Sequence, residues 1–261
     1  MSELALRTVS AVLLAALALA TAALGQWPLS LLWAAAGAAV AAEWTTVTAI
    51  APRRGLRTIL PAFAAATGLA LLISTLASAA VLSAGTIVVC ALGLGLRDRL
   101  WAVAGLWCGA VLAIVPVLVR ADPALGLPGL LWMFAVVWTT DVAAFFTGRR
   151  LGGPKLWPRV SPKKTWSGFV GGTFAGTLAG TATLVWFGGW APSALLVLAS
   201  AAASVVGQGG DLAESALKRH FGVKDSSRVI PGHGGFMDRL DGFWAVSVLV
   251  GAGVALRGVL R

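Results

Sequence analysis

Charged side chains are scarce in this 261-residue sequence: they make up 11% of the residues, whereas 58% are hydrophobic. Soluble domains carry roughly 25% charged residues, so the composition excludes an ordinary soluble globule. Tyrosine is absent, and cysteine and histidine each occur twice. Cys90 and Cys108 lie in apolar stretches without metal-ligand spacing, which argues against a cysteine metal centre and favours packing roles.

Long apolar runs occupy most of the chain. A helix needs about 20 apolar residues to cross a hydrocarbon core of about 30 Å. Nine runs approach this length, at 8–24, 29–50, 58–74, 77–96, 100–119, 127–147, 166–187, 192–206 and 243–260. The sequence therefore predicts an all-α, polytopic integral membrane protein with about nine transmembrane helices. The division of 58–96 rests on a mildly polar stretch at 74–83, and the short eighth run leaves room for continuation into 207–218.

Basic residues between the runs predict the orientation. With the amino terminus in the cytoplasm and the carboxyl terminus outside, all lysines and arginines except Arg120, Arg257 and Arg261 fall inside, as the positive-inside rule favours. The net charge of +10 suits anionic membrane lipids and phosphate-bearing solutes, and nucleic acid is not an expected partner. We expect a bacterial inner membrane protein whose site faces the cytoplasm. The first run is expected to be an uncleaved helix, because a second run follows at once.

The segment 207–243 concentrates polar chemistry, since it holds half of the acidic residues and both histidines. If 210–219 is helical, Asp211, Ser215 and Lys218 share one face, with Glu214 at its edge. Asp238 and Asp241 stand three apart, and on a helix they would point the same way. Paired carboxylates suit a hard cation such as Mg²⁺, although a solvated charged loop is the plainer alternative. We expect residues 1–126 to be a scaffold and 127–261 to carry this site.

Asp141 is a second polar feature, near the inner end of the sixth run. A carboxylate inside a span costs about 2.5–3.5 kcal/mol on insertion scales, so it should face protein or water. Pairing with Arg149 or Lys163 is the purely structural alternative.

The third polar feature is a loop at 161–172. Lys163 and Lys164, with Ser161 and Thr165, lie where a helix is expected to begin, and helix-start N–H groups together with ammonium groups favour a phosphate. Ordinary positive-inside anchoring is the alternative. The loop is not a P-loop, because its glycines follow the lysines. The three features together suggest phosphoryl or nucleotidyl transfer, which depends on cations and positioning.

Glycines recur every four residues in the seventh run, at Gly168, Gly172, Gly176 and Gly180. Small residues at this spacing form one helix face and allow close approach of a second helix. The pattern predicts a packing surface.

Several short motifs follow one another through the second half of the chain. They are Asp141-Val-Ala-Ala-Phe-Phe-Thr-Gly148, Ser161-Pro-Lys-Lys-Thr165, Ser215-Ala-Leu-Lys218-Arg219, Lys224-Asp225, Pro231-Gly-His233-Gly-Gly235 and Asp238-Arg239-Leu-Asp241. This series resembles the signature of the phosphatidate cytidylyltransferases, also called CDP-diacylglycerol synthases. The resemblance runs from about Asp141 to Gly242, and the amino-terminal half agrees only as hydrophobic spans.

The resemblance implies a reaction of phospholipid biosynthesis, in which CTP and phosphatidic acid give CDP-diacylglycerol and pyrophosphate with Mg²⁺. It implies Asp211, Asp238 and Asp241 as metal ligands, and these acids together with Lys218 as the catalytic set. The substrate-binding residues implied are Asp141, Ser161, Lys163, Lys164, Thr165, Ser215, Arg219, Lys224, Asp225, His233 and Arg239. The chain departs from the family pattern at Phe145, Ser167 and Gly242, none of which is a metal-facing acid. Expected partners are CTP, phosphatidic acid and membrane lipids; a homodimer is an assembly that the sequence leaves open.

Three other functions compete with this one. A CTP-dependent polyprenol or phytol kinase would transfer the γ-phosphoryl group and release CDP. An ion-coupled transporter would use Asp141 and the inner acids, but its acids should lie at the midplane and beside broken helices. A CDP-alcohol phosphatidyltransferase would need an aspartate-glycine motif followed by alanine-arginine, which does not occur here.

Overall fold

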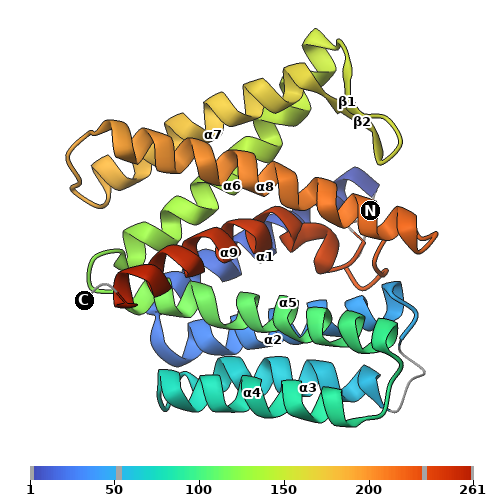
Figure 1. The fold of residues 1–261 in the computed structure, drawn as a ribbon. Coiled ribbons are helices and arrows are strands. Elements are labelled where there is room, and N and C mark those ends of the chain that lie inside the picture. The colour runs from blue at the N-terminus through green and yellow to red at the C-terminus, as the bar shows by residue number, and fades with distance from the viewer. Residues whose placement is uncertain (1–2, 51–54, 231–233, 260–261) are drawn as a thin grey trace. The chain divides into compact units, whose positions relative to one another are not determined.

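The computed structural model describes residues 3–50, 55–230 and 234–259. Within them the chain is mostly helical (Figure 1), with α1 (Glu3–Leu24), α2 (Gln26–Val47), α3 (Leu56–Ala70), α4 (Thr75–Ala91), α5 (Leu96–Ala121), α6 (Gly126–Leu151), α7 (Trp166–Trp186), α8 (Ala194–His220) and α9 (Met237–Val259). The chain forms two compact units. Unit 1 contains 1–121 and 221–240, and unit 2 contains 122–220 and 241–261.

The helices follow the apolar runs. The predicted division of 58–96 is confirmed: Ser74 ends the first run and caps α4, where its Oγ accepts a hydrogen bond from the Ala77 N–H at 3.0 Å. The eighth run continues, as the sequence allowed, to His220. In the part of the chain that the structure describes, five helices are long and apolar enough to cross a membrane: α5, α6, α7, α8 and α9.

Unit 1 is built on α2, which packs against α3 and α5. The two longer helices α2 and α5 meet at glycines, because a Cβ on Gly37 would lie 2.3 Å from the carbonyl oxygen of Gly109. Beside this contact, Trp44 of α2 donates from its indole N–H to the Trp101 carbonyl at 2.8 Å. Buried aliphatic side chains from α3, including Leu56 and Leu60, complete the core. The carboxyl-terminal half of α2 is therefore held by contacts with α5 and α3.

Unit 2 is built on the pair α6 and α7, which lie side by side in Figure 1. The predicted glycine face of α7 is confirmed as their contact: a Cβ at each of Gly168, Gly172, Gly176 and Gly180 would lie between 2.0 and 2.8 Å from an atom of α6. Helix α8 packs against both. Two buried hydrogen bonds tie it to α6, from Trp132 to Ser200 at 2.9 Å and between Thr140 and Ser204 at 2.7 Å.

Residues 161–165, which we predicted as part of a loop, instead form one strand of a short hairpin. This hairpin is the exception to the predicted all-α fold among the described residues. β1 (Lys155–Trp157) pairs antiparallel with β2 (Ser161–Thr165). Prolines and two lysines hide the strand pattern, because these residues are depleted in strands. At its end Thr165 is buried and caps α7, accepting a hydrogen bond from the Gly168 N–H at 3.1 Å. The hairpin therefore holds Lys163 and Lys164 directly before α7.

Candidate active site

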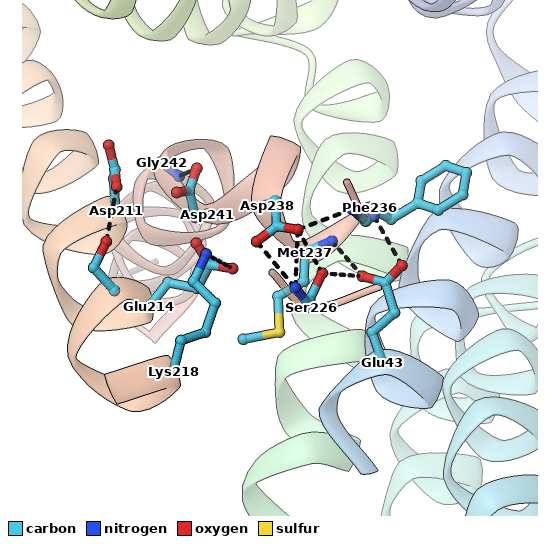
Figure 2. A network of polar contacts seen from close by, with 12 residues as sticks. Glu43, Asp211, Glu214, Lys218, Ser226, Phe236, Met237, Asp238, Asp241 and Gly242 are labelled. Atoms are coloured by element: carbon cyan, nitrogen blue, oxygen red, sulfur yellow. Dashed lines mark hydrogen bonds and ion pairs between the residues drawn. The ribbon is translucent and has the colours of Figure 1, made fainter. Parts of the chain in front are cut away.

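Three carboxylates meet in unit 2, where α8 supplies Asp211 and Glu214 and α9 supplies Asp241 (Figure 2). One oxygen from each lies within 4.8 Å of the others. A glycine permits this approach: a Cβ on Gly210 would lie 2.5 Å from the Ala245 Cβ and 2.6 Å from the Asp241 carbonyl oxygen. We call Asp211, Glu214 and Asp241 the acid cluster.

Two lysines neutralise part of the acid cluster. Lys218 lies one turn after Glu214 on α8, with its Nζ 3.1 Å from a Glu214 carboxylate oxygen, and both side chains are buried. Lys164 reaches from β2 to Asp211, with Nζ and Oδ2 2.5 Å apart. When all three carboxylates are ionised, Lys164 and Lys218 supply two positive charges against three negative ones. A further cation at the acid cluster is then favourable, since unbalanced buried charge is costly.

The donor set fits a hard divalent cation. Mg²⁺ prefers oxygen ligands and is usually held by one or two carboxylates together with water and substrate phosphates. The acid cluster offers carboxylate oxygens from two helices, and Asp211 and Asp241 are only half-buried, so both remain partly open to solvent. The residues present therefore match the Mg²⁺ that the sequence predicted.

The structure brings together five of the predicted site residues in unit 2: Asp211, Asp241, Lys218, Lys164 and, at 3.5 Å from Asp211, Ser215. The predicted helical face of α8 accounts for three of them. Glu214 completes the cluster, although sequence reasoning placed it only at the edge of that face. Its spacing, three residues after Asp211 and four before Lys218, is the signal that identifies it.

Asp238 lies at the start of α9 in unit 1 and has hydrogen-bond donors of its own (Figure 2). Its carboxylate accepts from the Ser226 N–H at 3.0 Å, the Ser226 hydroxyl at 2.9 Å and the Gly235 N–H at 2.8 Å. These bonds hold Ser226 and Gly235 beside the first turn of α9. The metal role of Asp238 stays a prediction from the family resemblance.

The other predicted residues occupy varied environments. Thr165 is buried and Ser161 is half-buried on β2, whereas Lys163 is exposed. Exposed side chains are found at Asp141 on α6, Arg219 at the end of α8, and Lys224, Asp225 and Arg239 in unit 1. His233 lies outside the described residues.

Glu43 is a polar residue that sequence reasoning missed. It lies on α2 in unit 1, is 6% exposed, and accepts hydrogen bonds from the Ser227 hydroxyl and the Met237 N–H at 2.6 and 2.8 Å. The available signal was an acidic residue alone within the apolar run 29–50, since a charge there is expensive without partners.

Comparison with known proteins places the whole chain in one family. The model of the cytidylyltransferase family matches residues 5–256. Phosphatidate cytidylyltransferases of Brucella suis biovar 1 (strain 1330) and Brucella abortus biovar 1 (strain 9-941) are 41% and 40% identical over 257 residues, which cover 96% of this chain and 93% of theirs. The phosphatidate cytidylyltransferase of Staphylococcus haemolyticus (strain JCSC1435) is 46% identical over 125 residues, 48% of each chain. Because the family model and the Brucella relatives cover nearly the whole sequence, the chain belongs to the cytidylyltransferase family.

Proposed function

We propose that this protein is a phosphatidate cytidylyltransferase, which condenses CTP with phosphatidic acid to give CDP-diacylglycerol and pyrophosphate. The observation that carries the proposal is the acid cluster with Lys164 and Lys218, in a chain similar over nearly its full length to phosphatidate cytidylyltransferases. Anionic and cationic groups side by side suit a reaction whose two substrates both carry phosphates.

In the reaction, a phosphate oxygen of phosphatidic acid attacks the α-phosphorus of CTP. A new P–O bond forms, the bond between the α-phosphorus and the α–β bridging oxygen breaks, and the electron pair leaves with pyrophosphate. The attacking oxygen is already ionised at neutral pH, so the residues need not remove a proton from it. The protein must instead orient the two phosphates and stabilise charge that moves to the leaving group.

Each charged residue has a distinct role in this scheme. Asp211, Glu214 and Asp241 would hold Mg²⁺, which when bound supplies positive charge to phosphate oxygens. Lys164 and Lys218 hold the acid cluster together and provide ammonium groups for phosphates, as charge-assisted hydrogen bonds are the strong ones. The Mg²⁺ requirement and Asp238 as a further ligand are carried by the resemblance and the donor chemistry.

The membrane arrangement proposed has nine spans, with the amino terminus in the cytoplasm, the carboxyl terminus outside and the acid cluster at the cytoplasmic face. Two contacts support it by joining groups at the expected outer side. Arg120 donates to the Ala22 carbonyl at 2.9 Å in unit 1, and Arg257 lies 3.5 Å from Asp122 in unit 2. The bacterial relatives suggest the inner membrane. A homodimer stays an expectation, which native mass spectrometry in detergent would test.

The test of the proposed function follows two phosphates separately. Purified protein is incubated with phosphatidic acid, MgCl₂ and CTP labelled at either the α- or the γ-phosphate. A cytidylyltransferase places the α-label in lipid and the γ-label in pyrophosphate. A γ-label in lipid with release of CDP would identify a lipid kinase instead. Ion flux into proteoliposomes without CTP turnover would identify a transporter, and either result overturns the proposal.

Lys164→Ala is expected to raise the KM of at least one substrate, CTP or phosphatidic acid, about tenfold or more. A hydrogen bond to a charged group contributes about 1.5–3 kcal/mol, and 1.4 kcal/mol corresponds to a factor of ten. The melting temperature should change little, because the pair with Asp211 is partly exposed. Titrations of each substrate measure the two KM values. Lys155→Ala is the control, because Lys155 is an exposed lysine on the other strand of the hairpin. Unchanged KM values for both substrates would contradict a phosphate-binding role.

A further inference from the structure

We propose that Glu43 is a positioning residue for this reaction: its buried carboxylate on α2 holds Ser226 and Ser227 beside Phe236 and Met237, at the start of α9. The proposal rests on the proposed function for its kinetic part. Its structural part concerns unit 1 alone. Because Glu43 lies in the half of the chain expected to be scaffold, it gives that half a direct part in shaping a functional segment.

Four donors converge on this carboxylate, and Figure 2 labels Ser226, Phe236 and Met237 among them. The hydroxyl groups of Ser226 and Ser227 donate at 2.9 and 2.6 Å, and the backbone N–H groups of Phe236 and Met237 donate at 3.0 and 2.8 Å. Both carboxylate oxygens are used, each by one hydroxyl and one N–H. Glu43 is 6% exposed, and three donors together with a hydroxyl shared with Asp238 compensate its carboxylate for burial.

The two backbone donors lie where α9 begins, at Met237. The first N–H groups of a helix have no partner within that helix, and a negative charge is favourable at this end. Capping usually comes from a residue just before the helix, whereas here it comes from α2, nearly two hundred residues earlier in the chain. Glu43 therefore sets where α9 starts and how its first turn is oriented.

Two glycines, Gly234 and Gly235, allow the backbone before α9 to lie close to the carboxylates of Asp238 and Glu43. A Cβ on Gly235 would lie 2.0 Å from the Ser226 Oγ and 2.5 Å from a Glu43 oxygen. Gly234 has φ of +82°, a left-handed conformation that other residues rarely adopt, and its Cβ would lie 2.7 Å from an Asp238 oxygen. The glycine pair after His233 is thus explained by the two carboxylates around which the chain wraps.

Ser226 links Glu43 to Asp238. Its hydroxyl oxygen lies 2.9 Å from an oxygen of each carboxylate. A hydroxyl has one proton and can donate it fully to one acceptor at a time, so the orientations of the two acids depend on each other. Asp241 follows three residues after Asp238 on α9. A change at Glu43 therefore reaches the residues of the reaction through the segment, without touching substrate.

Glu43→Gln tests the proposal because it keeps the side-chain size but places an amide NH₂ among four donors. We expect kcat to fall about 10- to 100-fold, since misplacement by about 1 Å can cost a factor of 10². The KM values for CTP and phosphatidic acid should stay within about threefold, because no substrate contact is removed. Thr45→Val is the matched control: Thr45 is buried on the same helix, and its hydroxyl donates to the Ala42 carbonyl of α2 itself at 2.7 Å.

Hydrogen–deuterium exchange distinguishes a local role of Glu43 at the start of α9 from a general contribution of Glu43 to the stability of unit 1. In Glu43→Gln, amides of 226–230 and 234–240 should exchange faster than in the wild type while those of α3 and α5 are unchanged, which a uniform loss of stability would not produce. This readout needs no substrate, so it stands or fails independently of the proposed reaction.

Ser227→Ala provides a second variant that removes one donor and leaves α2 intact, in case Glu43→Gln does not fold. Its kcat should fall about 3- to 10-fold, which corresponds to about 0.7–1.4 kcal/mol, because three of the four donors to Glu43 remain. In the double variant the two effects should combine to less than their product, because both act on one contact. Unchanged exchange at 226–230 and 234–240, or a kcat within about twofold of wild type, in a folded variant of either residue would overturn the proposal.

Discussion

Asp241→Asn is expected to lower kcat by about 10³-fold or more while the protein stays folded. Removing one preorganised electrostatic group from an active site costs about 10²–10³, and the loss of a metal ligand should reach at least the upper end of that range. Asparagine keeps the shape of the side chain but removes the negative charge. The substitution removes one of the three carboxylates that would hold the cation, so the attraction of the acid cluster for a divalent cation falls.

The measurement has two parts, turnover and metal binding. Mg²⁺ that binds the folded state raises the melting temperature of the wild type, and this rise should disappear in Asp241→Asn. Asp122→Asn is the matched control, because Asp122 is an acid of the same unit that pairs with Arg257 at 3.5 Å. Near-normal turnover in Asp241→Asn, with an intact response to Mg²⁺, would refute the assignment of the acid cluster.

Asp238→Asn is also expected to abolish turnover, on the evidence of the family resemblance. The same assays distinguish the two ways in which it can do so. A metal ligand, when neutralised, removes the Mg²⁺ response and leaves exchange at 226–230 and 234–240 slow. A residue that shapes the segment through Ser226 and Gly235 leaves the Mg²⁺ response and accelerates that exchange. Retained activity would contradict both roles.

The helices and part of the site were predictable because they depend on local patterns. The apolar runs predicted the helices. The four-residue glycine spacing predicted a close-packing face on α7, and the structure identifies α6 as the helix that packs against it. The α8 face was predictable for a similar reason: Asp211, Ser215 and Lys218 are related by helical spacing alone. In each case the information lies within one or two turns of the chain.

The remaining features depend on contacts between distant segments. Glu43 and Met237 meet across almost the whole sequence, and no local pattern specifies that pair. Glu214 joins Asp211 and Asp241 because α8 approaches α9 at Gly210, and the spacing of residues along either helix does not specify that approach. The hairpin was missed because Pro and Lys residues have poor strand propensity. The strand 161–165 is instead anchored at its end by Thr165, which caps α7, and the local sequence does not reveal that contact.

The second large effect is expected on stability, from Gly176→Val in α7. A Cβ at this position would lie 2.0 Å from the Thr140 Oγ1, 3.0 Å from the Ser204 Oγ and 3.1 Å from the Val136 carbonyl oxygen. Thr140 cannot turn away freely, because it is buried and its hydroxyl is hydrogen-bonded to Ser204. Overpacking of this kind costs about 3 kcal/mol, which should lower the melting temperature by about 6–12 °C.

Gly253→Val in α9 is the matched control for this substitution. A Cβ there would meet no atom within 4 Å, so the same change of residue should leave the melting temperature within about 2 °C of wild type. Thr140→Ala combined with Gly176→Ala should restore part of the stability that Gly176→Ala loses, because it removes the nearest clashing atom. Equal effects of Gly176→Val and Gly253→Val would show that intrinsic helix propensity, and not the contact of α7 with α6, governs the response. A smaller loss at position 176 would mean that the two helices can separate without cost, and the glycine face would then have no role in holding unit 2 together.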